Sequence, residues 1–107
     1  MYHYIWKITI TDPSKVEPFI QVWRDASAVL QEYPGAQGTY LQRVLGEDNT
    51  FLAIANWESK AARDAMKADT DADQSERAQR WQAFPKSDEF GTVETIAKTE
   101  DVTSVKL

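Results

Sequence analysis

Three polar side chains in this chain could carry acid–base chemistry or bind a polar group. His3 is the only histidine among the 107 residues, and imidazole titrates near neutral pH, so it is the first candidate for a general base. It lies on the strand face opposite Trp6, so we expect it to point away from a pocket on the other side. Asn56 could orient a carbonyl group or cap a turn, and Arg43 could hold an anionic ligand or lie at the rim of an interface.

Large apolar side chains form a second group of candidates. The chain has four tryptophans, which is many for its length, and such residues line either cores or aromatic-binding pockets. Trp6, Trp23, Trp81 and Met66 could form the wall of a pocket between a sheet and its helices and bind a small aromatic molecule. The more common role of such residues is simply to fill the core.

Other kinds of site are not supported by the sequence. The chain lacks cysteine, which excludes thiolate chemistry and cysteine metal sites. Asp69, Asp71 and Asp73 resemble the start of a calcium loop, but Gln74 and Arg80 stand where such a loop needs glycine and glutamate, so we expect no metal. No glycine-rich loop for phosphate is visible. The net charge of −5, without a basic face, argues against nucleic acid.

Length and composition indicate one soluble domain. A chain of 107 residues is long enough for one modest core, and we expect residues 1–107 to form a single unit. The N-terminal stretch has neither the basic leader nor the apolar core of a signal peptide, and no segment is long enough to span a membrane. A cytoplasmic location is therefore the expectation.

The stretch from Phe51 to Ala55 organises the predicted fold. It is an uninterrupted apolar run, which is typical of a central strand covered on both faces. Ser59 then resembles an N-cap for a helix beginning at Lys60. A box formed by Ser14 and Glu17 is expected to cap the first helix.

The remaining elements follow from periodicity. Alternation predicts strands, and apolar residues three and four apart predict helices. The expected elements are a strand over Tyr2–Thr11, a helix ending near Tyr33, strands over Gly38–Leu45 and Thr92–Lys98, a short helix capped by Asp73, and an extended tail with Val102, Val105 and Leu107.

This order of elements is β-α-β-β-α-β, the α+β arrangement of the ferredoxin-like fold with a four-stranded antiparallel sheet. Both helices would cover one sheet face. The other face would be bare, although the central strand is apolar on both sides. Two copies meeting through their open faces would cover it, so we expect a homodimer, and the apolar tail could cross to the partner.

Several residues then resemble a known family, the antibiotic biosynthesis monooxygenase domain family, over Tyr2–Lys98. The resemblance consists of aromatic residues in the first helix, a Pro-Gly that ends it with a glycine three residues on, and a Trp-x-Ser turn into the second helix. These residues are Phe19, Trp23, Pro34, Gly35, Gly38, Trp57 and Ser59. The resemblance implies a dimeric α+β barrel, but the family is functionally mixed and fold does not fix activity.

The branches of this family differ in their site residues. Haem-degrading members use an asparagine, a tryptophan and a histidine where this chain has Trp6, Met66 and Glu76, so haem degradation is not expected. Quinol-oxidising members often have a histidine where this chain has Met66. Members that oxidise anthrone-like aromatics without metal or flavin use pocket residues such as asparagine, tryptophan and arginine, and Asn56, Trp57 and Arg43 are of the right kinds.

Two functions remain open at this point. The first is a cofactor-independent monooxygenase acting on a small aromatic or quinol-like compound in a pocket that excludes water. The second is a non-catalytic homodimer of the same fold that binds a small ligand or is purely structural. The sequence names neither the substrate nor the proton acceptor.

Overall fold

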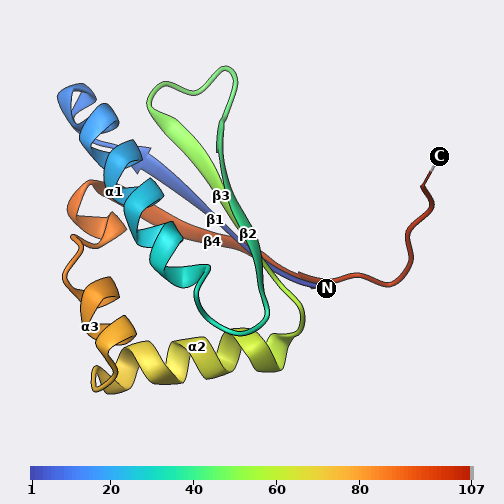
Figure 1. The fold of residues 1–107 in the computed structure, drawn as a ribbon. Coiled ribbons are helices and arrows are strands. Elements are labelled where there is room, and N and C mark those ends of the chain that lie inside the picture. The colour runs from blue at the N-terminus through green and yellow to red at the C-terminus, as the bar shows by residue number, and fades with distance from the viewer. Residues whose placement is uncertain (107) are drawn as a thin grey trace.

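The computed structural model describes residues 1–106 and contains one four-stranded antiparallel sheet (Figure 1). Its strands are β1 (Tyr2–Ile10), β2 (Ala36–Arg43), β3 (Thr50–Trp57) and β4 (Gly91–Glu100). Their order across the sheet is β2-β3-β1-β4, so the two apolar strands β3 and β1 are central. This is the ferredoxin-like order, and the predicted fold class is confirmed.

The helices cover one face of this sheet (Figure 1). They are α1 (Val16–Leu30), α2 (Lys60–Ala72) and α3 (Glu76–Gln82), with short 3-10 turns η1 (Pro13–Lys15) and η2 (Ser87–Glu89). The helix α3 lies in the connection between α2 and β4 and contacts both α1 and α2. Within residues 1–106, no helix is long and apolar enough to span a membrane.

The pairing of β1 with β3 sets which side chains face the helices. Tyr2 lies opposite Trp57 and Ile8 opposite Phe51, and because side chains alternate along a strand, every second residue between them faces the helices as well. The buried side chains form two clusters at opposite ends of this face. One contains Tyr2, Tyr33, Trp57 and Met66; the other contains Ile8, Ile10, Phe19 and Phe51.

Helix caps explain the boundaries that sequence patterns misplaced. The N-cap at Ser59 is confirmed, because its Oγ accepts the backbone N–H of Ala62 at 3.1 Å. The capping box at Ser14 is absent, because the carboxylate of Asp12 accepts the Ser14 N–H and starts η1 one turn earlier.

The third helix also begins later than expected. Asp73 does not cap it but ends α2 in a left-handed conformation, and Ser75 provides the N-cap instead. The expected acidic patch lies within α2, where Lys67 and Asp71 form an ion pair at 2.6 Å.

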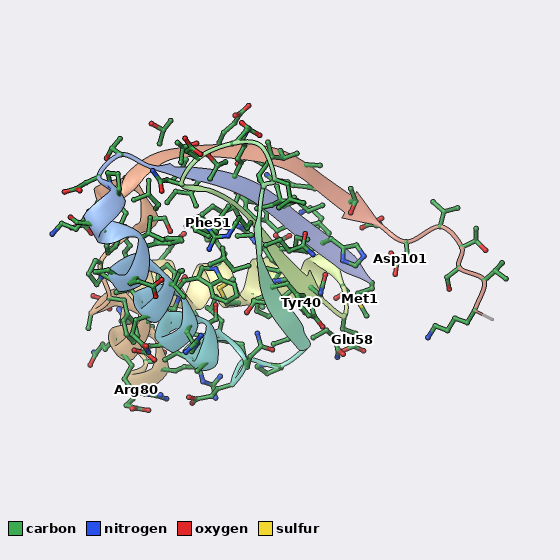
Figure 2. All side chains as sticks on the ribbon, turned by 90° about the horizontal axis from the view of Figure 1, so that it is seen from above. Met1, Tyr40, Phe51, Glu58, Arg80 and Asp101 are labelled. Atoms are coloured by element: carbon green, nitrogen blue, oxygen red, sulfur yellow. The ribbon has the colours of Figure 1, made fainter. Side chains whose placement is uncertain are left out.

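The face of the sheet opposite the helices is open within this single chain. Ile5, Leu52 and Ile54 lie on it and are only half-buried, while Tyr40 on the edge strand β2 is 56% exposed (Figure 2). Beyond β4 the tail runs away from the domain (Figure 1), with Val102 and Val105 almost fully exposed. Leu107, which was also expected in this apolar tail, lies outside the described residues.

The turn from α1 into β2 provides a matched test of this packing. Gly35 and Gly46 have similar left-handed φ angles, +84° and +87°, but a Cβ on Gly35 would lie 2.5 Å from the Cβ of Ala62 on α2, whereas a Cβ on Gly46 would meet nothing. Both alanine variants should lose about 1 kcal/mol from backbone strain. Gly35→Ala should lose a further ~1–3 kcal/mol from overpacking. Urea unfolding of the two variants measures the difference, and equal losses would contradict this account of the turn.

Candidate functional site

An apolar cavity of about 170 Å³ lies between the sheet and the helices. Residues from β1, β2, β3, α1, α3 and the segment before β4 line it. Its lining includes Trp6, Phe19, Trp23, Ala26, Ser27, Leu30, Thr39, Ala53, Ala55, Trp81, Phe84, Lys86, Ser87 and Phe90. A cavity of about 150 Å³ lined by apolar residues can hold one benzene molecule, so this volume suits one aromatic ring.

The cavity exists because the central strand changes residue size along its buried face. Phe51 and Trp57 are large and belong to the two separate core clusters, whereas Ala53 and Ala55 between them are small. Ala26 on α1 is small as well and lines the same space. Protein interiors are normally closely packed. Here the large residues of the two clusters separate the sheet from α1, and the small residues between them leave the space unfilled.

Three indole rings form the wall of this cavity. Trp6 comes from β1, Trp23 from α1 and Trp81 from α3, and the structure brings all three together. Met66, proposed for the same wall, does not line the cavity. It lies on α2, which covers the other end of the sheet, and it packs in the cluster of Tyr2 and Trp57.

Polar contacts hold α3, and with it Trp81, against the rest of the domain. The guanidinium of Arg80 donates to both carboxylate oxygens of Glu32 at the end of α1, at 2.6 and 2.8 Å, and also pairs with Glu76 at 2.6 Å. The side-chain amide of Gln82 donates to the Thr70 carbonyl of α2 at 2.7 Å. A helix of about two turns is thereby tied to both neighbours.

Among the residues that the structure describes, Lys86 is the one charged residue that lines the cavity, and sequence reasoning missed it. Its Nζ is inaccessible to solvent and has no hydrogen-bond partner within residues 1–106. The ammonium lies 3.9 Å from the centre of the Trp81 ring, a cation–π contact. The sequence offers no signal for this burial, because a lysine in a loop between helix and strand is normally solvated.

The backbone around Lys86 is fixed from both sides. Its N–H donates to a carboxylate oxygen of Glu89 at 2.5 Å, and its carbonyl accepts the Glu89 N–H at 3.0 Å, which closes the turn η2. Phe90 at the end of this turn packs edge-on against Phe19 of α1, with ring centres 5.6 Å apart. The turn therefore directs the lysine stem inward.

Burial lowers the pKa of the Lys86 ammonium, while the more distant charges of Glu89, Asp73 and Asp88 oppose the shift to a smaller extent. A lysine of this kind can accept a proton from a ligand or pair with an anion, depending on its own charge. The hydroxyl-bearing residues Ser27, Thr39 and Ser87 also belong to the lining, so a bound ring could be oriented from several sides.

His3 and Asn56 are brought together, but on the open face of the sheet. Nδ1 of His3 lies 2.5 Å from Oδ1 of Asn56 on the neighbouring strand, and Nε2 lies 2.8 Å from Oδ1 of Asp101. The hydrogen bond to Asn56, and then that to Asp101, raise the pKa of the imidazole. Because both nitrogens face acceptors, the pair suits a charged imidazolium that ties the tail to the sheet near Met1 (Figure 2).

Arg43 lies near neither the cavity nor His3. Its guanidinium is 5.2 Å from the centre of the Phe51 ring, in a shallow depression bordered by Trp23 and Tyr40 at the edge of β2. The three polar candidates thus lie outside the central cavity, while three of the four apolar candidates line it.

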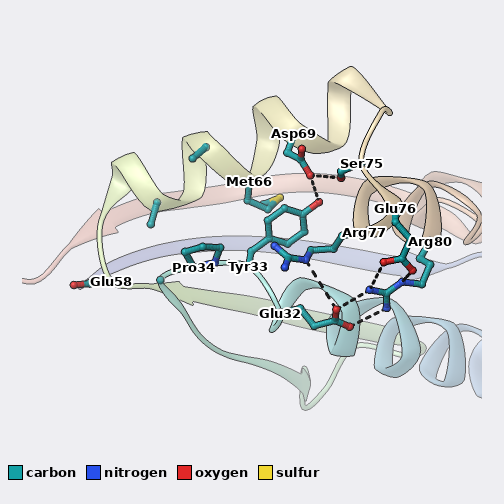
Figure 3. Close-up of a pocket in the computed structure, with 13 residues that line it drawn as sticks. Glu32, Tyr33, Pro34, Glu58, Met66, Asp69, Ser75, Glu76, Arg77 and Arg80 are labelled. Atoms are coloured by element: carbon teal, nitrogen blue, oxygen red, sulfur yellow. Dashed lines mark hydrogen bonds and ion pairs between the residues drawn. The ribbon is translucent and has the colours of Figure 1, made fainter.

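A second, open groove of about 590 Å³ lies between α2, α3 and the end of α1 (Figure 3). Its polar groups already satisfy one another. The hydroxyl of Tyr33 donates to Asp69 at 2.7 Å, Ser75 donates to the same carboxylate at 2.6 Å, and Arg77 stacks over the Tyr33 ring (Figure 3). Because these groups are already paired with one another, the groove carries less chemistry than the cavity. Within residues 1–106, no cluster of three potential metal ligands is present.

Fold and cavity together define a small ferredoxin-like protein with an apolar pocket between its sheet and helices. Residues 1–83 match the family described as antibiotic biosynthesis monooxygenase, which is more than half of the chain, and the chain belongs to this family. The resemblance found in the sequence is therefore confirmed. No match was found among curated protein sequences.

Solved structures of low sequence identity share the fold. SnoaB from Streptomyces nogalater, a cofactor-independent oxygenase solved as a point mutant, is 19% identical, with 97% of this chain and 95% of that chain covered and a TM-score of 0.64. A mutant of MhuD, solved with two manganese protoporphyrin IX molecules per active site, is 18% identical, with 99% of each chain covered and a TM-score of 0.68.

A third relative extends the same comparison. A Deinococcus radiodurans protein classed with the antibiotic biosynthesis monooxygenases is 9% identical, with 100% of this chain and 98% of that chain covered and a TM-score of 0.70. At these identities the likeness establishes the fold alone, and the chemistry has to be argued from the cavity.

The unpaired lysine predicts a pH-dependent stability. Because the pKa of Lys86 is lowered by folding, the unfolded chain binds more protons there, and stability rises with pH up to the unfolded pKa of about 10.4. Lys86→Met, which keeps the length of the side chain, should raise the free energy of unfolding at pH 7 and give no gain near pH 11. Urea unfolding across this range measures the effect. Lys98→Met, at an exposed lysine outside the cavity, is the control.

Proposed function

We propose that this chain is an oxygenase that acts on a single-ring aromatic or quinol-like compound held in the central cavity. The observation that carries the proposal is a cavity of about 170 Å³ walled by Trp6, Trp23 and Trp81, which matches one ring in volume and in chemistry. Membership of the monooxygenase family and the fold shared with SnoaB support oxygen chemistry.

The reaction needs little from the protein beyond this container. An ionised hydroquinone is electron-rich and can itself reduce dioxygen. One oxygen atom enters the ring and the other leaves as water, so a hydroquinone and dioxygen give a hydroxyquinone and water without a separate reductant. The cavity would hold the ring away from bulk water and keep a reactive peroxide intermediate from hydrolysis.

Cavity size argues against larger ligands of the kind this family fold can hold. A porphyrin has several times the area of one ring, and the sole histidine, His3, lies on the opposite face of the sheet, where it cannot ligate a metal in this cavity. Porphyrin binding of the kind seen in the MhuD mutant therefore does not fit these residues. Fused-ring anthrones also exceed the volume, so single-ring quinols are the better substrates.

The proposal includes a homodimer. The open face presents Ile5, Leu52 and Ile54 to solvent in the single chain, and a second copy would cover them. The exposed tail around Val102 and Val105 would then lie within reach of the partner. A dimer would also stiffen the sheet that forms the floor of the cavity.

A space-filling substitution tests the cavity as the site. Ala26→Phe should fill it and reduce the affinity for hydroquinone by about tenfold or more, because the added ring occupies the same volume. Ala28→Phe, on the exposed side of the same helix, should bind as the wild type does. Tryptophan fluorescence and oxygen uptake are followed together. Binding without uptake in the wild type supports a non-catalytic ligand-binding protein instead, and absence of both leaves a structural role.

The dimer is tested on the open face. Ile5→Glu places a charge among apolar neighbours that a partner would cover, so it should shift the molecule from dimer to monomer in sedimentation velocity. Val93→Glu, at a 40% exposed position on the edge strand β4, should leave the assembly unchanged. A wild-type chain that sediments as a monomer at high concentration would refute the proposal.

A further inference from the structure

We propose that Lys86 ionises the hydroxyl group of a phenolic ligand in the cavity, so that the site selects acidic phenols over neutral aromatic hydrocarbons. This inference rests on the proposed function for the location of the site, but it concerns a residue and a ligand class that neither the family match nor the fold assigns. It follows from where one nitrogen atom is placed.

The first step is that this nitrogen is buried without a partner. A buried amine or ammonium that makes no hydrogen bond costs free energy, and such groups are rare in folded proteins. The Nζ of Lys86 is nevertheless inaccessible to solvent and unpartnered within residues 1–106. The side chain of Lys86 lines the cavity, so a ligand that draws Nζ away from the Trp81 ring would provide the missing partner.

The second step concerns the charges around it. The carboxylates that influence Lys86 are Asp73 at the end of α2 and Asp88 and Glu89 in η2, and they act only through space. On the sheet and on α1 the lining of the cavity is apolar or hydroxylic. Among residues 1–106, no negative group therefore faces Nζ inside the cavity, and an anionic ligand would be the first.

The third step is the geometry of the aromatic wall. The Trp81 ring lies 3.9 Å from Nζ, so it can stabilise a positive charge there without donating or accepting a hydrogen bond. A phenol stacked against the indoles would bring its oxygen to the same end of the cavity. The ring would be recognised by the wall and the oxygen by the lysine.

The proton transfer balances within this pair. When Lys86 is in its neutral form, which burial favours, the O–H bond of the phenol breaks, its electron pair remains on oxygen, and the proton moves to Nζ. The product is a phenolate beside an ammonium, and the ion pair gives Nζ the partner that it lacks in the protein alone. In the proposed reaction the phenolate is also the form that transfers electrons to dioxygen.

Binding of 4-nitrophenol tests this step without any turnover, because the bound phenolate has its own visible absorption. Tryptophan fluorescence reports binding separately. In the wild type we expect the pKa of the bound probe to lie about 1–3 pH units below that of the free probe, as for an acid placed beside a cation. Nitrobenzene, which has no ionisable hydroxyl, should bind more weakly.

Variants separate the lysine from the cavity. Lys86→Met should still bind the probe, with its pKa unshifted or raised, and Lys86→Arg should keep the lowered value. Lys98→Met, at an exposed lysine beside Tyr4, should behave as the wild type. If Lys86→Met binds with the same lowered pKa, the assignment to Lys86 fails while the cavity proposal stands. If the wild type does not bind the probe, the proposed function itself fails.

Turnover gives a second readout. With a hydroquinone substrate, Lys86→Met should lower the rate of oxygen uptake at pH 7 by about 10²-fold or more, the usual contribution of a general base. The deficit should narrow above the phenol pKa of about 10, where hydroxide ionises the substrate without help. A deficit that is constant across pH would indicate a purely structural role and overturn the inference.

Discussion

The structure depends on one packing constraint, the change of residue size along the buried face of β3. Phe51 and Trp57 at its ends each complete a dense cluster, and these clusters set the distance between the sheet and α1. Ala53 and Ala55 between them cannot fill that distance. By the scale of engineered cavities, a gap of about 170 Å³ forfeits at most about 4 kcal/mol of stability. For a small domain this is a substantial loss of stability, and such losses are typical of positions that are kept for function.

The same constraint explains why the lysine lies where it does. Because the clusters hold α1 away from the sheet, the segment between α3 and β4 must close the side of the gap. Arg80 and Gln82 fix α3 to its neighbours, and Phe90 fixes the end of the segment on Phe19. Lys86 lies between these anchors, and its Nζ is inaccessible to solvent. Burial of an unpartnered amine lowers the stability of the fold, but it places a titratable group at the wall of an apolar cavity.

Much of the fold could be predicted because it depends on local sequence patterns. The alternation along β1 and the apolar run of β3 fix which residues face the helices, and Ser59 fixes where α2 starts. Choices between adjacent candidates could not be predicted. Asp12 competes with Ser14, and Ser75 with Asp73, for the same free N–H groups, and only the path of the chain decides between them.

The candidate site could likewise be predicted only in part. Trp6, Trp23 and Trp81 converge because each lies on the apolar face of its own element, which periodicity reveals. Met66 also lies on an apolar face, yet α2 covers the other end of the sheet, and no local pattern shows which end a helix covers. The burial of Lys86 depends on contacts between segments far apart in the chain, so a sequence can indicate an aromatic wall while leaving its one ionisable group hidden.

The two faces of the sheet differ in the polar groups that they carry. The helix face holds the cavity and its lysine, whereas His3 and Asn56 on the open face are occupied with each other and with Asp101. A histidine whose two ring nitrogens both have partners has no free lone pair for substrate, and His3 lies on the face of the sheet opposite the cavity. Relatives with this fold are only 9–19% identical to this chain, and one of them was solved with two manganese protoporphyrin IX molecules per active site, so the fold alone does not set the size of the pocket. In this chain Ala53 and Ala55 leave room for one ring. Because the amine of Lys86 is unpartnered, the proposed site would select ligands by the acidity of their hydroxyl group.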